Sequence, residues 1–253
     1  MGADNVFSMS AATALHAFEK LTTLGVHLGD RRMAEASQVL DLDWPELARV
    51  LPDGGLPRGV TELSAPHAHG GGTTVTLAAM RAAQRAGNHV HCAWIEAEGA
   101  PSLYAPEVLV GGVDPERLLV VRAPREALGR VALKALATGA FAVVAVAQGA
   151  NEGPRPRGLD ERAVRRLALS AEDVGARVLL LTDAFSAHGS WPTALRLELE
   201  RLPESIHVRV ARERRGRTGQ ARSISLRSRP LGRSEPAPTL APVHALTLPS
   251  ARP

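Results

Sequence analysis

The sequence contains little cysteine, few aromatic residues and no long apolar run. Cys92 is the single cysteine in 253 residues, so no disulfide can form within the chain, which fits the reducing cytoplasm. No stretch approaches the roughly 18 consecutive apolar residues of a transmembrane helix, and the amino terminus lacks the basic-then-apolar pattern of a signal peptide. We therefore expect a soluble cytoplasmic protein that does not contact a membrane.

Aromatic residues make up 3% of the chain, so its core must be built from alanine, valine and leucine. The length suits one domain of ordinary size with short appendages. The net charge of +4 is small, but residues 196–233 hold 11 Arg and 4 Glu, which gives this segment +7. Such a segment suits a polyanion or an acidic partner, and a solvated basic surface is equally typical.

The stretch Leu56–Glu98 has the pattern of a strand, a glycine-rich turn, a helix and a second strand. Val60–Leu63 is a short apolar run, and Thr73–Ala86 contains good helix formers with apolar side chains available to face a sheet. Val90–Ile95 is almost wholly apolar, as expected of a parallel strand covered on both faces. This unit predicts the start of a parallel α/β sheet.

The glycine-rich turn stands where a phosphate-binding loop, G-x-x-x-x-G-K-[ST], would lie. When Gly71 and Thr73 are aligned with that motif, Pro66 replaces its first glycine and Gly72 replaces its lysine. The backbone amides and hydroxyls of a degenerate loop remain, from Gly70, Gly71, Gly72, Thr73 and Thr74. Loss of the lysine is expected to cost roughly 2–4 kcal/mol of phosphate binding.

The remaining core is expected to continue as alternating helices and strands. We predict strands at Arg117–Val121, Phe141–Val146 and Val178–Leu181, and helices at Arg125–Thr138 and Asp160–Val174. Apolar and polar residues then alternate around Leu195–Leu199, Ile206–Val210 and Ile224–Leu226, which is the period of half-buried strands. These last strands are expected to form an antiparallel extension at the edge of the sheet.

Three parts of the chain are distinguished by composition. Residues 1–50 are expected to be a helical segment, with a frayed start to Ser10, helices at Ala11–Leu24 and Arg31–Leu40, and a short helix capped by Asp43. Residues 51–229 form the core. Residues 230–253 contain six prolines, so this tail is expected to be disordered, either frayed or docked on a partner through Leu240, Val243, Leu246 and Leu248.

Seven segments resemble the RecA recombinase family in matching order, and the resemblance spans about Leu51–Arg229. They are LPRGVTELSAP, GGTTVTLAAMRAAQRAG, CAWIEAE, LY, VDPERLLVVRAP, ALATGAFAVVAVA and ALRLELERLP. The small core and altered loop are further similar to the ImuA family, the accessory proteins of bacterial damage-inducible mutagenesis cassettes. The resemblance implies a RecA-like α/β core whose mostly parallel sheet lies between helices. It also implies that the amino-terminal helix packs on the next protomer, although packing on its own core is equally open.

The resemblance also assigns candidate nucleotide residues. Glu98 matches the glutamate that polarises the attacking water, and Tyr104 matches the adenine-stacking tyrosine. The alternative for Glu98 is a solvated loop carboxylate, which the missing lysine favours. The alternative for Tyr104 is an ordinary half-buried aromatic residue. Ala147, followed by Gln148, replaces the acidic residue that orients magnesium, and Thr182-Asp183 replaces a glutamine that senses the γ-phosphate. We therefore expect a core that does not hydrolyse ATP, in which Glu98 is vestigial and no cofactor is bound.

Two regions are candidates for DNA or partner contacts. Arg155 and Arg157 lie where recombinases place their first DNA-binding loop, and the second loop is reduced to Ala184–Trp191. Arg214, Arg215 and Arg217 form a basic turn near the end of the core. These arginines could neutralise phosphates of single-stranded DNA, whereas an ordinary surface loop is the commoner reading of the first pair.

A metal site is not expected. His67 and His69 precede the glycines, and His89, His91 and Cys92 follow the predicted helix, but no zinc spacing is met.

The sequence thus predicts a non-catalytic accessory protein in damage-induced (SOS) translesion synthesis. The partners that the ImuA resemblance implies are an ImuB-like polymerase-related protein, an error-prone C-family DNA polymerase and RecA itself, whose activity it would inhibit. A divergent DNA-dependent ATPase and a DNA-binding module that uses the arginine-rich strands remain open as alternatives.

Overall fold

The computed structural model describes residues 8–10, 39–66, 70–149, 158–183 and 191–229. The strands are β1 (Ser8–Ser10), β2 (Val39–Leu40), β3 (Leu56–Pro57), β4 (Gly59–Ala65), β5 (His91–Ala97), β6 (Leu118–Ala123), β7 (Phe141–Ala147), β8 (Arg177–Asp183), β9 (Leu195–Arg201), β10 (Ser205–Glu213) and β11 (Ala221–Ser225). The α-helices are α2 (Pro45–Ala48), α3 (Gly72–Arg85), α4 (Ala105–Val110), α5 (Leu128–Ala137) and α6 (Glu161–Val174), with 3₁₀ turns at Pro115–Arg117 and Arg125–Ala127.

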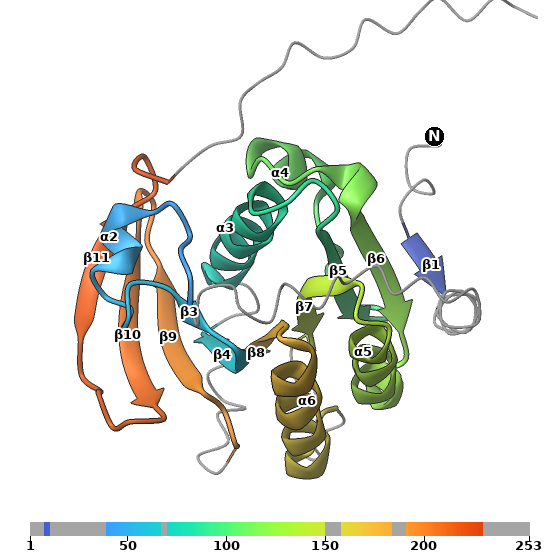
Figure 1. The fold of residues 1–253 in the computed structure, drawn as a ribbon. Helices are drawn as coiled ribbons and strands as arrows, with labels where there is room; N and C mark the ends of the chain where they lie inside the picture. Colours follow the sequence, from blue (N-terminus) through green and yellow to red (C-terminus); the bar gives the residue numbers. More distant parts are fainter. Residues whose placement is uncertain (1–7, 11–38, 67–69, 150–157, 184–190, 230–253) are drawn as a thin grey trace, which may run out of the picture.

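Within these ranges nine strands form one sheet in the order β1-β6-β5-β7-β8-β4-β9-β10-β11 (Figure 1). Each pair from β1 to β9 in that order is parallel, whereas β10 is antiparallel to both β9 and β11. Crossover connections between parallel strands carry helices α3, α5 and α6. The predicted α/β class with a mostly parallel sheet is confirmed.

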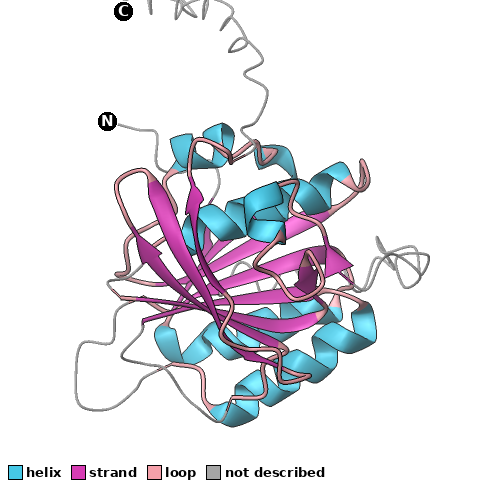
Figure 2. Cartoon of the chain, turned by 90° about the vertical axis from the view of Figure 1, so that its left-hand side faces the viewer, coloured by secondary structure: helices cyan, strands magenta, loops and turns pink. Residues whose placement is uncertain are grey.

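Helices cover both faces of the sheet (Figure 2). One face packs against α3, and its buried side chains include Trp94, Val143, Leu181 and Leu197. The opposite face packs against α5 and α6 through residues such as Ile95, Val144 and Leu180. Successive residues of one strand thus enter opposite cores, because side chains alternate along a strand. This explains the continuous apolar runs of β5, β7 and β8.

The predicted strands and helices of the core lie within a few residues of where the sequence places them. Strands β4 to β10 extend further at their carboxyl ends, whereas β11 extends at its amino end and stops at Ser225. Asp160 caps α6 by accepting a hydrogen bond from the amide of Ala163 (2.7 Å), and Gly175 ends it in the left-handed conformation. Helix α4 was not predicted, because only Val108 among its six residues is buried and the usual apolar stripe is missing.

The amino-terminal region departs from expectation in two places. Ser8–Ser10 is an edge strand that pairs with β6, not a frayed end. Asp43 does not cap α2: it has a positive φ of 52°, and Trp44 holds the cap position without a side-chain hydrogen bond. The expected helix Ala11–Leu24 lies outside the described residues, as do most of Arg31–Leu40 and the whole tail from 230 to 253; Val39–Leu40 is described and forms strand β2.

Residues 39–57 also extend the core across the boundary expected at residue 50. Leu42, Trp44 and Leu47 are buried in the same cluster as the side chains of β9 and β10. The guanidinium of Arg81, on α3, donates a hydrogen bond to the carbonyl of Leu42 (2.8 Å). This segment therefore covers the α3-side face of the last strands, and Figure 1 shows α2 beside β11.

The edge extension is antiparallel and joins the parallel sheet through β9. β9 lies parallel to β4, from the Thr61–Leu195 pair to Ser64–Glu198, and antiparallel to β10, which is in turn antiparallel to β11. The predicted antiparallel extension at the edge of the sheet is therefore confirmed. Alternation alone could not have shown that β9 is parallel to β4, because a half-buried strand has a period of two in either orientation.

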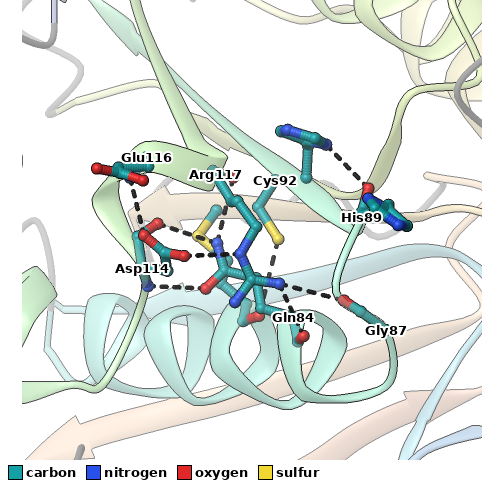
Figure 3. Close-up of polar contacts among 9 residues, drawn as sticks. Gln84, Gly87, His89, Cys92, Asp114, Glu116 and Arg117 are labelled. Carbon is teal, nitrogen blue, oxygen red and sulfur yellow. Dashed lines mark hydrogen bonds and ion pairs between the residues drawn. The ribbon is translucent and has the colours of Figure 1, made fainter.

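A polar network holds the carboxyl end of α3 (Figure 3). Arg117 donates to the carbonyls of Gln84 (3.0 Å) and Gly87 (3.1 Å) and, through Nε, to Asp114 (2.7 Å). The Gln84 amide in turn donates to the carbonyls of Asp114 and Arg117 and accepts from the Asp114 amide. Carbonyls at the end of a helix lack hydrogen-bond donors within the helix. Arg117 provides donors at this end.

None of the helices within the described ranges combines the length and the apolar character needed to cross a bilayer.

Candidate functional site

The candidate nucleotide site lies at the carboxyl ends of β4, β7 and β8, beneath the amino end of α3. Gly71 holds the helix cap position and Gly72 is the first helical residue, so the first amides of α3 face this edge of the sheet. Thr73 and Thr74 are half-buried in the same turn. The strand–turn–helix arrangement of a phosphate-binding loop is therefore present, although residues 67–69 lie outside the described part.

Gly71 packs directly against the edge extension. Its φ of 97° lies in the left-handed region, and a Cβ added there would stand 2.9 Å from Cγ2 of Ile206 on β10. Only glycine meets both demands without strain. The loop is therefore fixed by an apolar contact with β10.

The floor beneath the loop is apolar. A Cβ added at Gly72 would lie 3.6 Å from Cδ2 of Leu181, and Leu181 pairs with Ala147 across β8 and β7. The cavity at this place is about 10 Å³, room for roughly one water molecule. Among the described residues its lining contains one charged side chain, Asp183, which is acidic. Within the described residues, no cationic side chain lines this cavity.

Thr182 is engaged away from the loop. Its hydroxyl donates to Oε1 of Glu62 (2.9 Å), which is completely buried in β4. The other oxygen, Oε2, has no hydrogen bond and lies 3.7 Å from Nε of Arg196. Burial raises the pKa of Glu62, and the charge of Arg196 and the Thr182 hydrogen bond only partly oppose this. The Thr182 hydroxyl therefore stabilises a buried carboxyl group.

Glu96 is the carboxylate that the sequence reading did not single out. Its Oε2 accepts from Trp94 Nε1 and from the amide of Leu103 (both 2.9 Å), and its Oε1 accepts from Arg122 Nε (2.9 Å). It is buried and pairs with Ala147 across β5 and β7. The signal in the sequence that could have indicated it was an acid two residues after a tryptophan in an apolar strand. Its bonds give it a structural role, which leaves it poorly suited to bind a metal ion.

Glu98 and Tyr104 lie at the same edge as exposed side chains. Glu98 follows β5, and its amide donates to the carbonyl of Ala123 (2.9 Å). Tyr104 is the residue before α4, and its ring is largely exposed rather than half-buried. Gln148, beside Ala147, is buried and accepts from the amide of Leu159 (3.4 Å), at the start of the α6 segment.

The basic turn after β10 is paired with acids. Arg217 binds Asp53 through both terminal nitrogens (2.8 and 2.7 Å) and also binds Glu213. These contacts hold the pKa of Asp53 below its usual value. Arg214 pairs with Glu172 (2.8 Å), and Arg215 stands 4.0 Å from Asp53. Arg155 and Arg157 lie outside the described residues. The turn is thus largely neutralised by its own chain.

The histidine and cysteine residues do not gather into a site. His91 Nδ1 lies 2.9 Å from the carbonyl of His89, and the thiol of Cys92 points to the carbonyl of Met80 (3.7 Å, Figure 3). Burial raises the pKa of the Cys92 thiol to about 12, so it carries no thiolate at neutral pH. No group of three metal-binding side chains occurs in the described residues, and His67 and His69 lie beyond them.

The fold is that of RecA-like proteins. A crystal structure of the RadB recombinase superposes on it with a TM-score of 0.57 and 18% sequence identity, covering 76% of this chain and 98% of RadB. No curated protein matches the sequence. A model of the family described as the MT3502 N-terminal domain matches residues 49–193, more than half of the chain. The chain therefore belongs to the MT3502 N-terminal domain family.

Proposed function

We propose that this chain is a non-catalytic RecA-like accessory protein of the ImuA type, which acts in damage-induced translesion synthesis through protein contacts. One observation supports the proposal: in the alignment with RecA-like ATPases, Gly72 and Ala147 fall at the positions of a lysine and an acid, and the apolar Leu181 lies beside both. A nucleotide triphosphate needs cations at its phosphates, and its hydrolysis needs an oriented metal ion.

The partners of this proposal are an ImuB-like protein, an error-prone C-family polymerase and RecA. A RecA-like protomer that cannot turn over ATP would cap or poison a RecA filament. Strand exchange and filament ATPase by RecA should therefore fall when the protein is added in stoichiometric excess. Unchanged RecA activity under that condition would refute this part of the proposal.

The core of the proposal is tested by nucleotide binding and turnover, with and without single-stranded DNA. We expect neither in the natural protein. A Gly72→Lys/Ala147→Asp variant, whose folding is checked by circular dichroism, is the matched comparison and should gain binding. DNA-stimulated turnover by the natural protein would instead identify a divergent motor.

The two alternative functions have less support from the geometry. Lys20 and Lys134 are the only lysines; Lys134 lies on α5, across the sheet from α3, and Lys20 is outside the described residues. An ATPase would therefore depend on an arginine. A DNA-binding module that uses Arg214, Arg215 and Arg217 would have to break their acid pairs, and its affinity would fall steeply with salt.

A further inference from the structure

Helix α4 presents an apolar surface. The exposed fractions of Tyr104, Leu109 and Val110 are 66%, 61% and 48%, and these are three of the six large apolar side chains exposed in the described residues. Val108 is the only buried residue of α4. The sequence YAPEVLV, residues 104–110, contains one charged residue, Glu107. Half of these exposed apolar side chains thus lie within seven consecutive residues, a concentration that is typical of a binding site.

This surface is preformed because α4 is held by a polar contact before the helix and by burial at its end. Before the helix, the amide of Leu103 donates to Glu96, which is buried in β5 (2.9 Å). At its end, the amides of Gly111 and Val113 close the helix on its own carbonyls of Glu107 (2.8 Å) and Val108 (3.1 Å), and Val108 and Val113 are buried in the α3-side core. A helix of six residues is not stable alone, so the Leu103–Glu96 bond and this burial hold it in place. Figure 1 shows α4 at the top of the molecule, above α3.

The chain leaves its core beside this helix. Leu226 packs on the α3-side core, and Ser228 Oγ accepts from Nε1 of the buried Trp44 (3.2 Å). Arg229, whose side chain is largely buried, lies 3.8 Å from the carboxylate of Glu107 on α4. Residues 226–229 thus lead from β11 to α4, where Glu107, the single charged residue of 104–110, lies beside Arg229.

The segment that follows has matching chemistry. Residues 230–253 include Leu231, Leu240, Val243, Leu246 and Leu248, and only one acid, Glu235. At roughly 3.3 Å per residue, Leu231 is within about 7 Å of Arg229. Six prolines restrict the segment before it binds, which lowers the entropy lost on docking. Its attachment to the core also makes docking intramolecular and raises its effective concentration.

We propose that the carboxyl-terminal segment 230–253 binds the α4 surface of its own chain through its leucine and valine side chains. The segment then covers Tyr104, and a protein that binds α4 must displace it.

A photo-reactive benzoylphenylalanine placed at Leu109 of the full chain tests this. Leu169 on α6 is the matched control position, because it is exposed to 58% and carries the same side chain. We expect Leu109 to cross-link to residues 230–253 within one molecule, at least tenfold more than Leu169 does. Mixing isotope-labelled and unlabelled protein distinguishes cross-links within a molecule from those between two.

A second variant keeps the test decisive. Serine at Leu240, Val243, Leu246 and Leu248 should abolish the cross-link and speed hydrogen exchange of residues 104–110, while exchange in β7 stays unchanged. Cross-links between molecules, cross-links to another segment, equal yields at Leu109 and Leu169, or no effect of the serine variant would each overturn the proposal.

Discussion

The two ends of α3 meet different surroundings. At its carboxyl end, Arg117 donates to the carbonyls of Gln84 and Gly87 and to the carboxylate of Asp114, and the Gln84 amide donates to the carbonyl of Asp114. At its amino end, Gly71 and Gly72 meet Ile206 and Leu181. The second end is where a RecA-like ATPase concentrates its charges, whereas the described residues here meet it with apolar side chains. The difference indicates that α3 is anchored by polar bonds at its carboxyl end and by apolar contacts at its amino end.

Removal of the Arg117 side chain should give the largest effect. Arg117→Ala removes the donor to the carbonyls of Gln84 and Gly87 and leaves Asp114 with only the amide of Glu116, so we expect a loss of about 3 kcal/mol in the free energy of unfolding. Urea denaturation measures it. Arg85→Ala, in the last turn of α3, is the control. The ion pair of Arg85 with Asp43 is half-exposed, so its removal should lower the free energy of unfolding by less than about 1 kcal/mol. Equal losses would show that the carboxyl end is not specially held.

Gly71→Ala should cost about 2 kcal/mol, since the new Cβ meets Ile206 and the backbone keeps a positive φ. Gly99→Ala separates the two causes: Gly99 has a φ of 77° with nothing within 4 Å of its added Cβ, so only the backbone cost remains. If the two variants are equally stable, the approach of the added Cβ at residue 71 to Ile206 contributes nothing to the loss of stability.

The buried Glu62 on β4 makes the free energy of unfolding depend on pH. Its folded pKa is raised above the ordinary 4.5, so the unfolded state ionises first as pH rises. The unfolded state then binds fewer protons than the folded one, and stability falls as pH rises from about 4.5 through the folded pKa. Glu62→Gln removes this loss. The variant should therefore gain stability relative to the natural protein between pH 4.5 and 7, and a constant difference across that range would contradict the shift.

Gly72→Lys should change stability least, by less than about 1 kcal/mol, because the nearest atoms to its added Cβ lie at ordinary contact distance. It nevertheless restores the missing cation, and we expect ATP affinity to rise at least about tenfold by calorimetry without turnover. Gly72→Gln, similar in length and uncharged, should leave affinity unchanged. If it binds ATP as well as the lysine variant does, charge is not what the amino end lacks.

Much of this architecture could be predicted from the sequence. Apolar runs and their turns placed β4 to β8, and a period of two placed β9 to β11, since burial on one or both faces leaves these patterns. The glycines at 70–72 likewise located the candidate site. The parallel pairing of β9 and the edge position of β1 could not be predicted, because they depend on which strands meet in space.

The burial of Glu62 and the long-range partner of Glu96 were also beyond sequence reasoning. A carboxylate in a strand usually marks a solvent-facing position, and these two meet Thr182, Arg196 and Arg122, which come from other strands. The contact of Ile206 with Gly71 has the same origin. Pairs of this kind join distant residues, whereas local patterns report only on neighbours.

The central position of β4 has a consequence for synthesis of the chain. Gly59–Ala65 pairs with β8 on one side and β9 on the other, strands that begin at residues 177 and 195. The first strand of the core thus stays without either neighbour until most of the protein has left the ribosome. Folding of such a sheet is slow, and its unpaired strands are exposed to aggregation in the meantime. Chaperone binding to nascent chains should therefore persist until β9 emerges, and ribosome profiling of chaperone-bound nascent chains would place its release there.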